Sequence, residues 1–93
     1  MNLGDFMKTI TKPIEMISWT EKDGKIHPIR FKIESSEGEQ IVYKVQKVYT
    51  RDFDKIAGNK VYCFTCEIVV NNNLRICELR YNLDTCCWYL FKL

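Results

Sequence analysis

The sequence has only one histidine, and its formal net charge is +2. Because His27 is alone, no Ser-His-Asp triad can be argued, and a Cys-His pair would need an unforeseen contact between His27 and a cysteine. The near balance of charges argues against a protein whose main work is coating nucleic acid. The sequence therefore contains no enzyme motif, and we predict a non-catalytic protein with no catalytic residue.

Long apolar runs are also missing, since no run approaches the length of a membrane span. The first residues, MNLGDFMKTITK, lack the uninterrupted apolar core and the small-residue cleavage site of a signal peptide. We therefore expect a cytoplasmic protein with no membrane partner. The chain shows no internal repeat and no low-complexity segment, and 93 residues are enough for one domain. We predict a flexible N-terminal segment over residues 1–12 and a single domain over residues 13–93.

Five cysteines are many for so short a chain, but the number is odd. Without a secretion signal, reduced thiols are favoured over a disulfide framework. Cys63 and Cys66 have the spacing of zinc and redox motifs, yet such pairs sit on a tight knuckle or at a helix start. Inside a strand this offset places the two sulfurs on opposite faces, and the neighbours Cys86 and Cys87 also point apart. We therefore predict structural cysteines, no metal site and no cofactor.

The last third of the chain consists of three apolar, aromatic and β-branched runs separated by two polar breaks. This pattern is typical of a three-stranded β-meander. A two-residue loop at Asn72-Asn73 pairs Cys66 with Leu79 and makes one face of the hairpin apolar, whereas a three-residue loop brings charged residues onto that face. A turn over residues 82–85 then pairs Leu79 with Trp88. The predicted core face comprises Phe64, Cys66, Ile68, Cys77, Leu79, Tyr81, Cys86, Trp88 and Leu90.

Three further strands are predicted over residues 14–20, 26–34 and 40–49. Asp23-Gly24 predicts a two-residue type I′ turn between the first two of them, because both central positions of that turn need positive φ. Pro28 lacks an amide hydrogen, so the start of the second strand is expected at an edge or beside a bulge.

The second and third strands also share an apolar face. Ile29, Phe31 and Ile33 alternate with charged residues, which is the period of a strand. Pairing Ile33 with Ile41 sets Phe31 against Tyr43 and Ile29 against Val45, and the face remains apolar throughout.

Residues 51–57 interrupt the β pattern. Phe53, Ile56 and Ala57 have helical spacing, and Gly58 suits a left-handed helix stop, so we predict a short helical turn, with an irregular loop as the alternative. Antiparallel strands in consecutive hairpins avoid exposed edges by curling into a barrel. The prediction is an all-β fold, a six-stranded antiparallel meander curled into a small barrel, with the helical turn near residues 51–57.

The segments DGKIHPIRFKIE, AGNKVYCFTCE and LRYNLDTCCWYLFKL resemble a group of small uncharacterised bacterial proteins, mostly from Firmicutes. These proteins share a DG-x-I-x-P-I-R-F strand, a GN turn, a cysteine-containing strand and a C-terminal W-Y-L element. The resemblance covers residues 14–93. It implies an all-β cytoplasmic protein and transfers no catalytic residue.

One face of the first sheet combines positive charge with an aromatic ring. The two-residue loop places Trp19 opposite Pro28 and Glu15 opposite Lys32, and the next pairing sets Arg30 directly opposite Lys44. Single-stranded nucleic acid binds small β-barrels through such faces. A solvated face, with Glu15 neutralising Lys32 and Trp19 packed on Pro28, is the simpler interpretation. The candidate ligand-binding face comprises Trp19, Arg30, Lys32, Lys44 and Gln46.

We predict an interaction module that binds a protein partner or forms a homodimer. The last strand is apolar on both sides, because Tyr89 and Phe91 alternate with Trp88 and Leu90. In an open sheet this strand is a template for the addition of another strand. Single-stranded nucleic acid or another polyanion, bound through the candidate face, is the alternative partner, and the low net charge argues against it.

Overall fold

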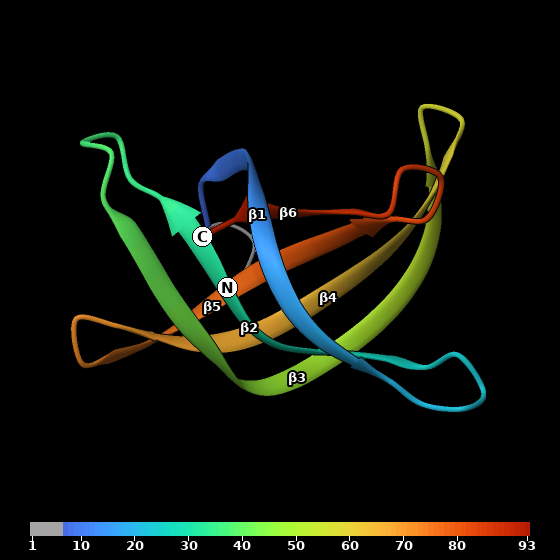
Figure 1. Cartoon of the computed structure of the whole chain (residues 1–93), viewed down its shortest axis with the longest axis horizontal. Coiled ribbons are helices and arrows are strands. Elements are labelled where there is room, and N and C mark those ends of the chain that lie inside the picture. Colours follow the sequence, from blue (N-terminus) through green and yellow to red (C-terminus); the bar gives the residue numbers. More distant parts are fainter. Residues whose placement is uncertain (1–6) are drawn as a thin grey trace.

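The computed structural model describes residues 7–93, which form six antiparallel strands closed into a barrel (Figure 1). The strands are neighbours in chain order, and the last returns to pair with the first. They are β1 (Thr9–Thr20), β2 (Ile26–Glu34), β3 (Gln40–Ile56), β4 (Asn59–Val70), β5 (Asn73–Asn82) and β6 (Cys87–Lys92). The predicted all-β, six-stranded meander barrel is confirmed.

The long strands β1 and β3 each pair with two partners in succession. The first part of β1 pairs with β6, and the part from Glu15 onward pairs with β2. Likewise, β3 pairs with β2 as far as Lys44 and with β4 from Val45 onward. The start of β2 therefore has no β3 neighbour, although the β1–β2 and β3–β4 turns lie at the same end of the barrel (Figure 1).

The buried core residues come from β2, β4, β5 and β6, and partly buried side chains of β1 and β3 pack against them. The predicted core face is confirmed with one exception. Cys86 lies in the β5–β6 turn with a φ of 59° and is exposed. Tyr81 is partly buried and packs against the core. The core cluster of buried residues comprises Phe31, Ile33, Phe64, Cys66, Ile68, Cys77, Leu79, Trp88 and Leu90.

The predicted strand register in the β4–β5–β6 meander is wrong by two residues. Cys66 pairs with Cys77 because the β4–β5 turn uses Asn71 and Asn72, whose φ angles are 50° and 64°. Leu79 pairs with Leu90 because the β5–β6 loop lies between Asn82 and Cys87, one residue later than predicted. A shift by two keeps every side chain on its face, since the side-chain period of a strand is two. The composition of the core face is therefore unchanged.

The β1–β2 turn differs in type from the prediction. Asp23 does not have positive φ, and the amide of Glu21 donates to the carbonyl of Lys25, so the loop has three residues and ends at Gly24 with a φ of 97°. The extra loop residue shifts the register by one, and a bulge at Ile29 restores the predicted pairing of Glu15 with Lys32. The bulge lies beside Pro28, as predicted, and leaves Ile29 exposed rather than in the core.

The predicted helical turn near residues 51–57 is wrong, because β3 continues through it to Ile56. Arg51 pairs with Phe64, and Phe53 pairs with Tyr62, so Phe53 belongs to a strand and not to a helix. The Phe53 and Tyr62 rings meet edge to face, with centroids 5.8 Å apart. Pairing with β4 provides hydrogen-bond partners for the backbone N–H and C=O groups of this part of β3. One or two helical turns would leave most of these groups without a partner in the chain.

In the β3–β4 turn, the energetic cost of a left-handed backbone conformation can be measured without changing any side-chain contact. Ala57 and Gly58 have φ angles of 51° and 83°, and a Cβ added at Gly58 meets nothing within 4 Å. Gly58→Ala should destabilise the fold by about 1 kcal/mol, because a left-handed conformation disfavours alanine. Ala57→Gly removes a Cβ from the same conformation and should not destabilise. Urea titrations of both variants check the difference, and equal losses of stability would contradict the assigned turn.

The N-terminal part of the chain joins the barrel earlier than residue 13. Thr9 pairs with Lys92 and Lys12 with Leu90, while Thr11 between them has a φ of 50°. Of the segment 1–12 predicted to be flexible, residues 1–6 lie outside the described residues. Because β6 pairs with β1, it has no open edge, and the predicted addition of a partner strand at β6 does not apply to the closed barrel.

Candidate functional site

The outer face of β1, β2 and β3 carries the residues that the sequence predicts as a ligand-binding face. Arg30 lies directly opposite Lys44, as predicted, and Lys32 follows two residues later on β2. Trp19 lies opposite His27, not opposite Pro28, because the β1–β2 loop has three residues and not two. Gln46 is exposed, but it lies past the last β2–β3 pair, at a bulge where β3 turns toward β4, so it has no β2 neighbour.

The positive charges of this face are only partly neutralised. Lys32 forms an ion pair with Glu15, with Nζ 3.2 Å from a carboxylate oxygen. Arg30 and Lys44 form no ion pair among residues 7–93. Two cations directly opposite each other on a sheet repel, so this arrangement does not stabilise the isolated barrel.

Exposed apolar side chains surround these cations, and two of them, Ile17 and Val42, were not among the residues predicted from the sequence for this face. Trp19 is 62% exposed, Val42 is 59% exposed and Ile17 is 55% exposed. Ile17 and Val42 line one open hollow of about 490 Å³, together with Arg30 and Lys32. The alternation of β1 and β3 contained the signal, because Ile17 and Val42 stand at outward positions of their strands.

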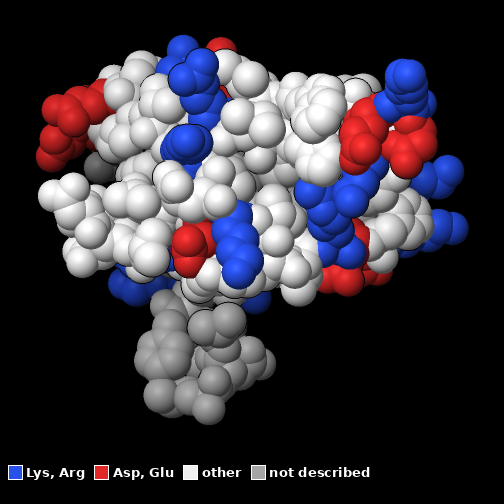
Figure 2. Space-filling model, turned by 90° about the horizontal axis from the view of Figure 1, so that it is seen from below, with Lys and Arg blue, Asp and Glu red and all other residues white. Residues whose placement is uncertain are grey.

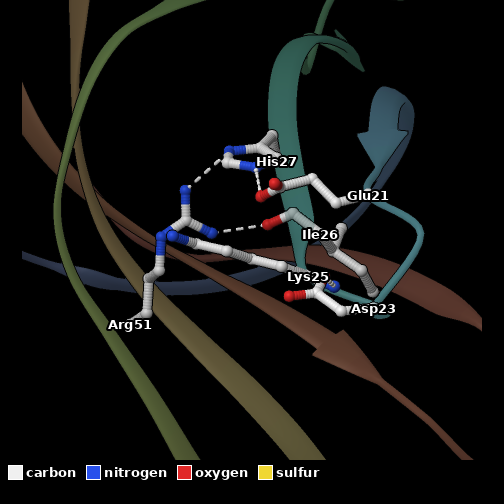
Figure 3. A network of polar contacts seen from close by, with 6 residues as sticks. All are labelled: Glu21, Asp23, Lys25, Ile26, His27 and Arg51. Carbon is white, nitrogen blue, oxygen red and sulfur yellow. Dashed lines mark hydrogen bonds and ion pairs between the residues drawn. The ribbon is translucent and has the colours of Figure 1, made fainter.

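A polar network holds the Trp19 end of the face in place (Figure 3). Trp19 stacks on His27, with ring centroids 5.3 Å apart and planes inclined by 27°. His27 in turn contacts Glu21 through Nε2 at 2.6 Å and Arg51 through Nδ1 at 2.9 Å. Arg51 reaches across from β3 and also donates to the carbonyl of Ile26. Arg51 thus satisfies a backbone carbonyl at the start of β2, where β2 is no longer paired with β3.

The hydrogen bonds assign the protonation of the His27 ring. Arginine can only donate, so Nδ1 of His27 accepts from Arg51 and carries no proton. Nε2 of the neutral ring carries the proton and donates it to the Glu21 carboxylate. Both ring nitrogens are therefore engaged, and neither is available as a base for a bound substrate.

The cysteines divide into buried and exposed groups. Cys66 and Cys77 are fully buried and face each other across β4 and β5, and burial raises the pKa of each thiol to about 12. Cys63, on the opposite face of β4 from Cys66, is partly buried, and burial also raises its pKa. Cys86 and Cys87 are exposed in and after the β5–β6 turn. The two buried thiols are protonated and are weak nucleophiles near neutral pH.

Figure 2 shows how charge is distributed over one side of the molecule. Basic and acidic side chains lie close to each other, and wide uncharged areas separate the charged groups on the side that is drawn. This side has no continuous basic stripe of the kind that tracks a nucleic-acid backbone.

Comparisons with models of protein families, with curated proteins and with solved structures find no match for this chain. Within residues 7–93 there is no helix with the length and apolarity needed to cross a membrane.

Proposed function

We propose that this protein is a small non-catalytic interaction module, and that the outer face of β1, β2 and β3 binds a protein partner. The observation that carries the proposal is the exposure of Trp19, Ile17 and Val42 on one sheet face beside Arg30 and Lys44. Contiguous exposed apolar side chains with charged neighbours are characteristic of interaction surfaces. Tryptophan and arginine are also the residues that contribute most at protein interfaces.

The charge of the face favours a partner that is different from the chain itself. Two copies joined through this face would bring Arg30 and Lys44 of both copies together, and like charges in an interface are costly. An acidic segment with apolar side chains complements both features of the face. We therefore propose an acidic, amphipathic protein segment as the partner.

The histidine and the buried cysteines support a non-catalytic role. His27 is occupied at both ring nitrogens, and the thiols of Cys66 and Cys77 are protonated because burial raises their pKa values. General bases and nucleophiles need an available nitrogen or a thiolate. A cytoplasmic location and kinship with the Firmicutes proteins remain predictions.

Selection of peptides from a random library tests the proposed partner class. We expect peptides enriched on the wild-type protein to combine acidic and apolar residues. Trp19→Ala should weaken their binding about 30-fold, the effect of losing an interface residue that contributes about 2 kcal/mol. The matched control is Leu74→Ala on β5, which removes a side chain that is 64% exposed and lies outside this face. Fluorescence anisotropy with labelled peptides measures the dissociation constants.

Three results would contradict the proposal. Equal binding to the Trp19→Ala and Leu74→Ala variants would remove this face from consideration. A dimer detected by light scattering and lost in Trp19→Ala would favour self-association. Binding of single-stranded DNA or RNA that weakens with salt and disappears in Arg30→Glu/Lys44→Glu would favour a polyanion ligand.

A further inference from the structure

A second concavity lies at the end of the barrel where β2 and β3 separate. Its volume is about 430 Å³, and it lies between the β1–β2 turn and the end of β3. It exists because β3 stops pairing with β2 at Lys44, while β2 continues outward to Ile26. This cleft is separate from the hollow on the outer sheet face, since the two share no lining residue.

One wall of the cleft is aromatic. Phe53, Tyr62 and Phe64 line it, and their rings follow one another with centroids 5.8 and 6.4 Å apart. Phe64 belongs to the core and is 3% exposed, whereas Phe53 is 54% exposed. An exposed ring continuous with core rings offers a flat apolar surface to a ligand.

Two cations line the same cleft. The Lys25 side chain extends toward Arg51 in Figure 3, and both residues border the cavity. Neither residue forms an ion pair with a carboxylate within residues 7–93. Arg51 is held over the Phe64 ring, with Cζ 5.6 Å from the centroid, by its bonds to Ile26 and His27. Because a guanidinium has five N–H donors, it can keep these two bonds and still bind an anion.

The two acidic residues that border the cleft, Asp23 and Asp52, form no ion pair with these cations. The Asp23 carboxylate accepts a hydrogen bond from the Lys25 amide within the turn, at 3.0 Å. Asp52 stands between Arg51 and Phe53 on β3, so strand alternation directs it to the opposite face of the sheet. Asp23 keeps its negative charge, so on this side of the sheet Lys25 and Arg51 supply two positive charges to the cleft against one carboxylate.

We propose that this cleft binds a small organic anion with a flat aromatic body. The rings of Phe53 and Tyr62 would stack against the aromatic body, and Arg51 and Lys25 would bind its carboxylate or phosphate. Apolar walls with a few convergent polar groups are the usual construction of small-molecule sites, and the volume of the cleft lies in their range. The charge-assisted hydrogen bonds to Arg51 would fix the orientation of the ligand.

The test is a titration of the ¹⁵N-labelled full-length protein, followed by NMR, with 1-naphthoate, 1-naphthyl phosphate and neutral 1-naphthol. We expect both anions to shift the amide signals of residues 23–26, 51–53 and 62–64, and naphthol to bind about tenfold more weakly or worse, because it forms no charge-assisted bond. The stronger of the two anions identifies the preferred head group. The absence of shifts at millimolar anion, or equal binding of naphthol, would overturn the proposal.

A matched pair of lysine variants separates a specific site from a general charge effect. Lys25→Ala removes a cation from the cleft, while Lys22→Ala removes an exposed cation from the same turn that does not border it. We expect Lys25→Ala to weaken anion binding several-fold and Lys22→Ala to leave it unchanged. Arg51→Lys keeps the charge but loses the planar fork, and it should weaken binding as well. Equal effects of the two alanine variants would overturn the assignment.

Discussion

Trp88→Ala is expected to lower the free energy of unfolding by about 3–5 kcal/mol, because it leaves a large cavity in the core. Trp88 is 8% exposed and lies on β6 between two other rings. Its centroid is 5.4 Å from that of Phe64 and 4.9 Å from that of Tyr81. The substitution thus removes the ring through which Phe64 on β4 and Tyr81 on β5 contact β6. Urea denaturation followed by circular dichroism measures the loss.

The second tryptophan provides the control for this experiment. Trp19 is 62% exposed and its main ring contact is the stack on His27. Trp19→Ala should therefore lower the free energy of unfolding by no more than about 1 kcal/mol, the usual range for an exposed aromatic pair. A similar loss of stability in both variants would mean that the assigned inner and outer faces of the barrel are wrong.

Raising the pH above 9 is expected to destabilise the barrel through Cys66 and Cys77. Burial, chiefly by desolvation of the thiolate, raises both pKa values from 9.0 to about 12. Because the folded pKa lies above the unfolded one, this contribution to stability is complete below pH 9 and is lost as the pH rises toward 12. A pH of about 10.5 lies about 1.5 units above the pKa of a thiol in the unfolded chain. Ionisation at this pH stabilises the unfolded state by roughly 2 kcal/mol for each thiol.

The double variant Cys66→Ala/Cys77→Ala isolates this effect from other titrating groups. Tyrosines and lysines titrate in both proteins, so only the thiol contribution differs between them. We expect the unfolding free energy of the wild type to fall by about 4 kcal/mol more than that of the variant between pH 8 and pH 10.5. Urea titrations at several pH values in reducing buffer measure this difference. Parallel pH dependences would show that the two thiols are hydrated in the folded protein.

The faces of the strands were predictable from the sequence, but the pairing of individual residues was predictable for only some of the hairpins. Ile33 pairs with Ile41 as predicted, in a hairpin whose short loop ends at Gly38 with a φ of 83°. In the β4–β5 hairpin, loops over residues 71–72 and 72–73 both place Cys66 in the core. Apolar patterning cannot distinguish registers that differ by two residues, since both bury the same side chains.

The false helix and the missed cleft have a related cause. Phe53 and Ile56 have a spacing that fits a helix, and only the pairing of β3 with β4 shows that these residues extend a strand. This last part of β3 places Arg51 beside the start of β2, where it contacts Ile26 and His27, which are distant from it in the sequence. The cations opposite each other on β2 and β3 were predictable from local pairing. The contacts between Arg51 and β2 were not predictable, because they depend on where β2 and β3 stop pairing.

Closure of the barrel by β1 and β6 also implies a time order for folding. Hairpins between consecutive strands join residues that are near in the chain, whereas the β1–β6 ladder joins the first strand to the last. Such long-range pairing forms slowly, because more chain entropy is lost in closing the longer loop. Until it forms, β1 and β6 each present an open edge, and β6 carries the large side chains of Trp88, Tyr89, Leu90 and Phe91. The edge that is protected in the native barrel is exposed in the folding chain, and the risk of aggregation is concentrated in that interval.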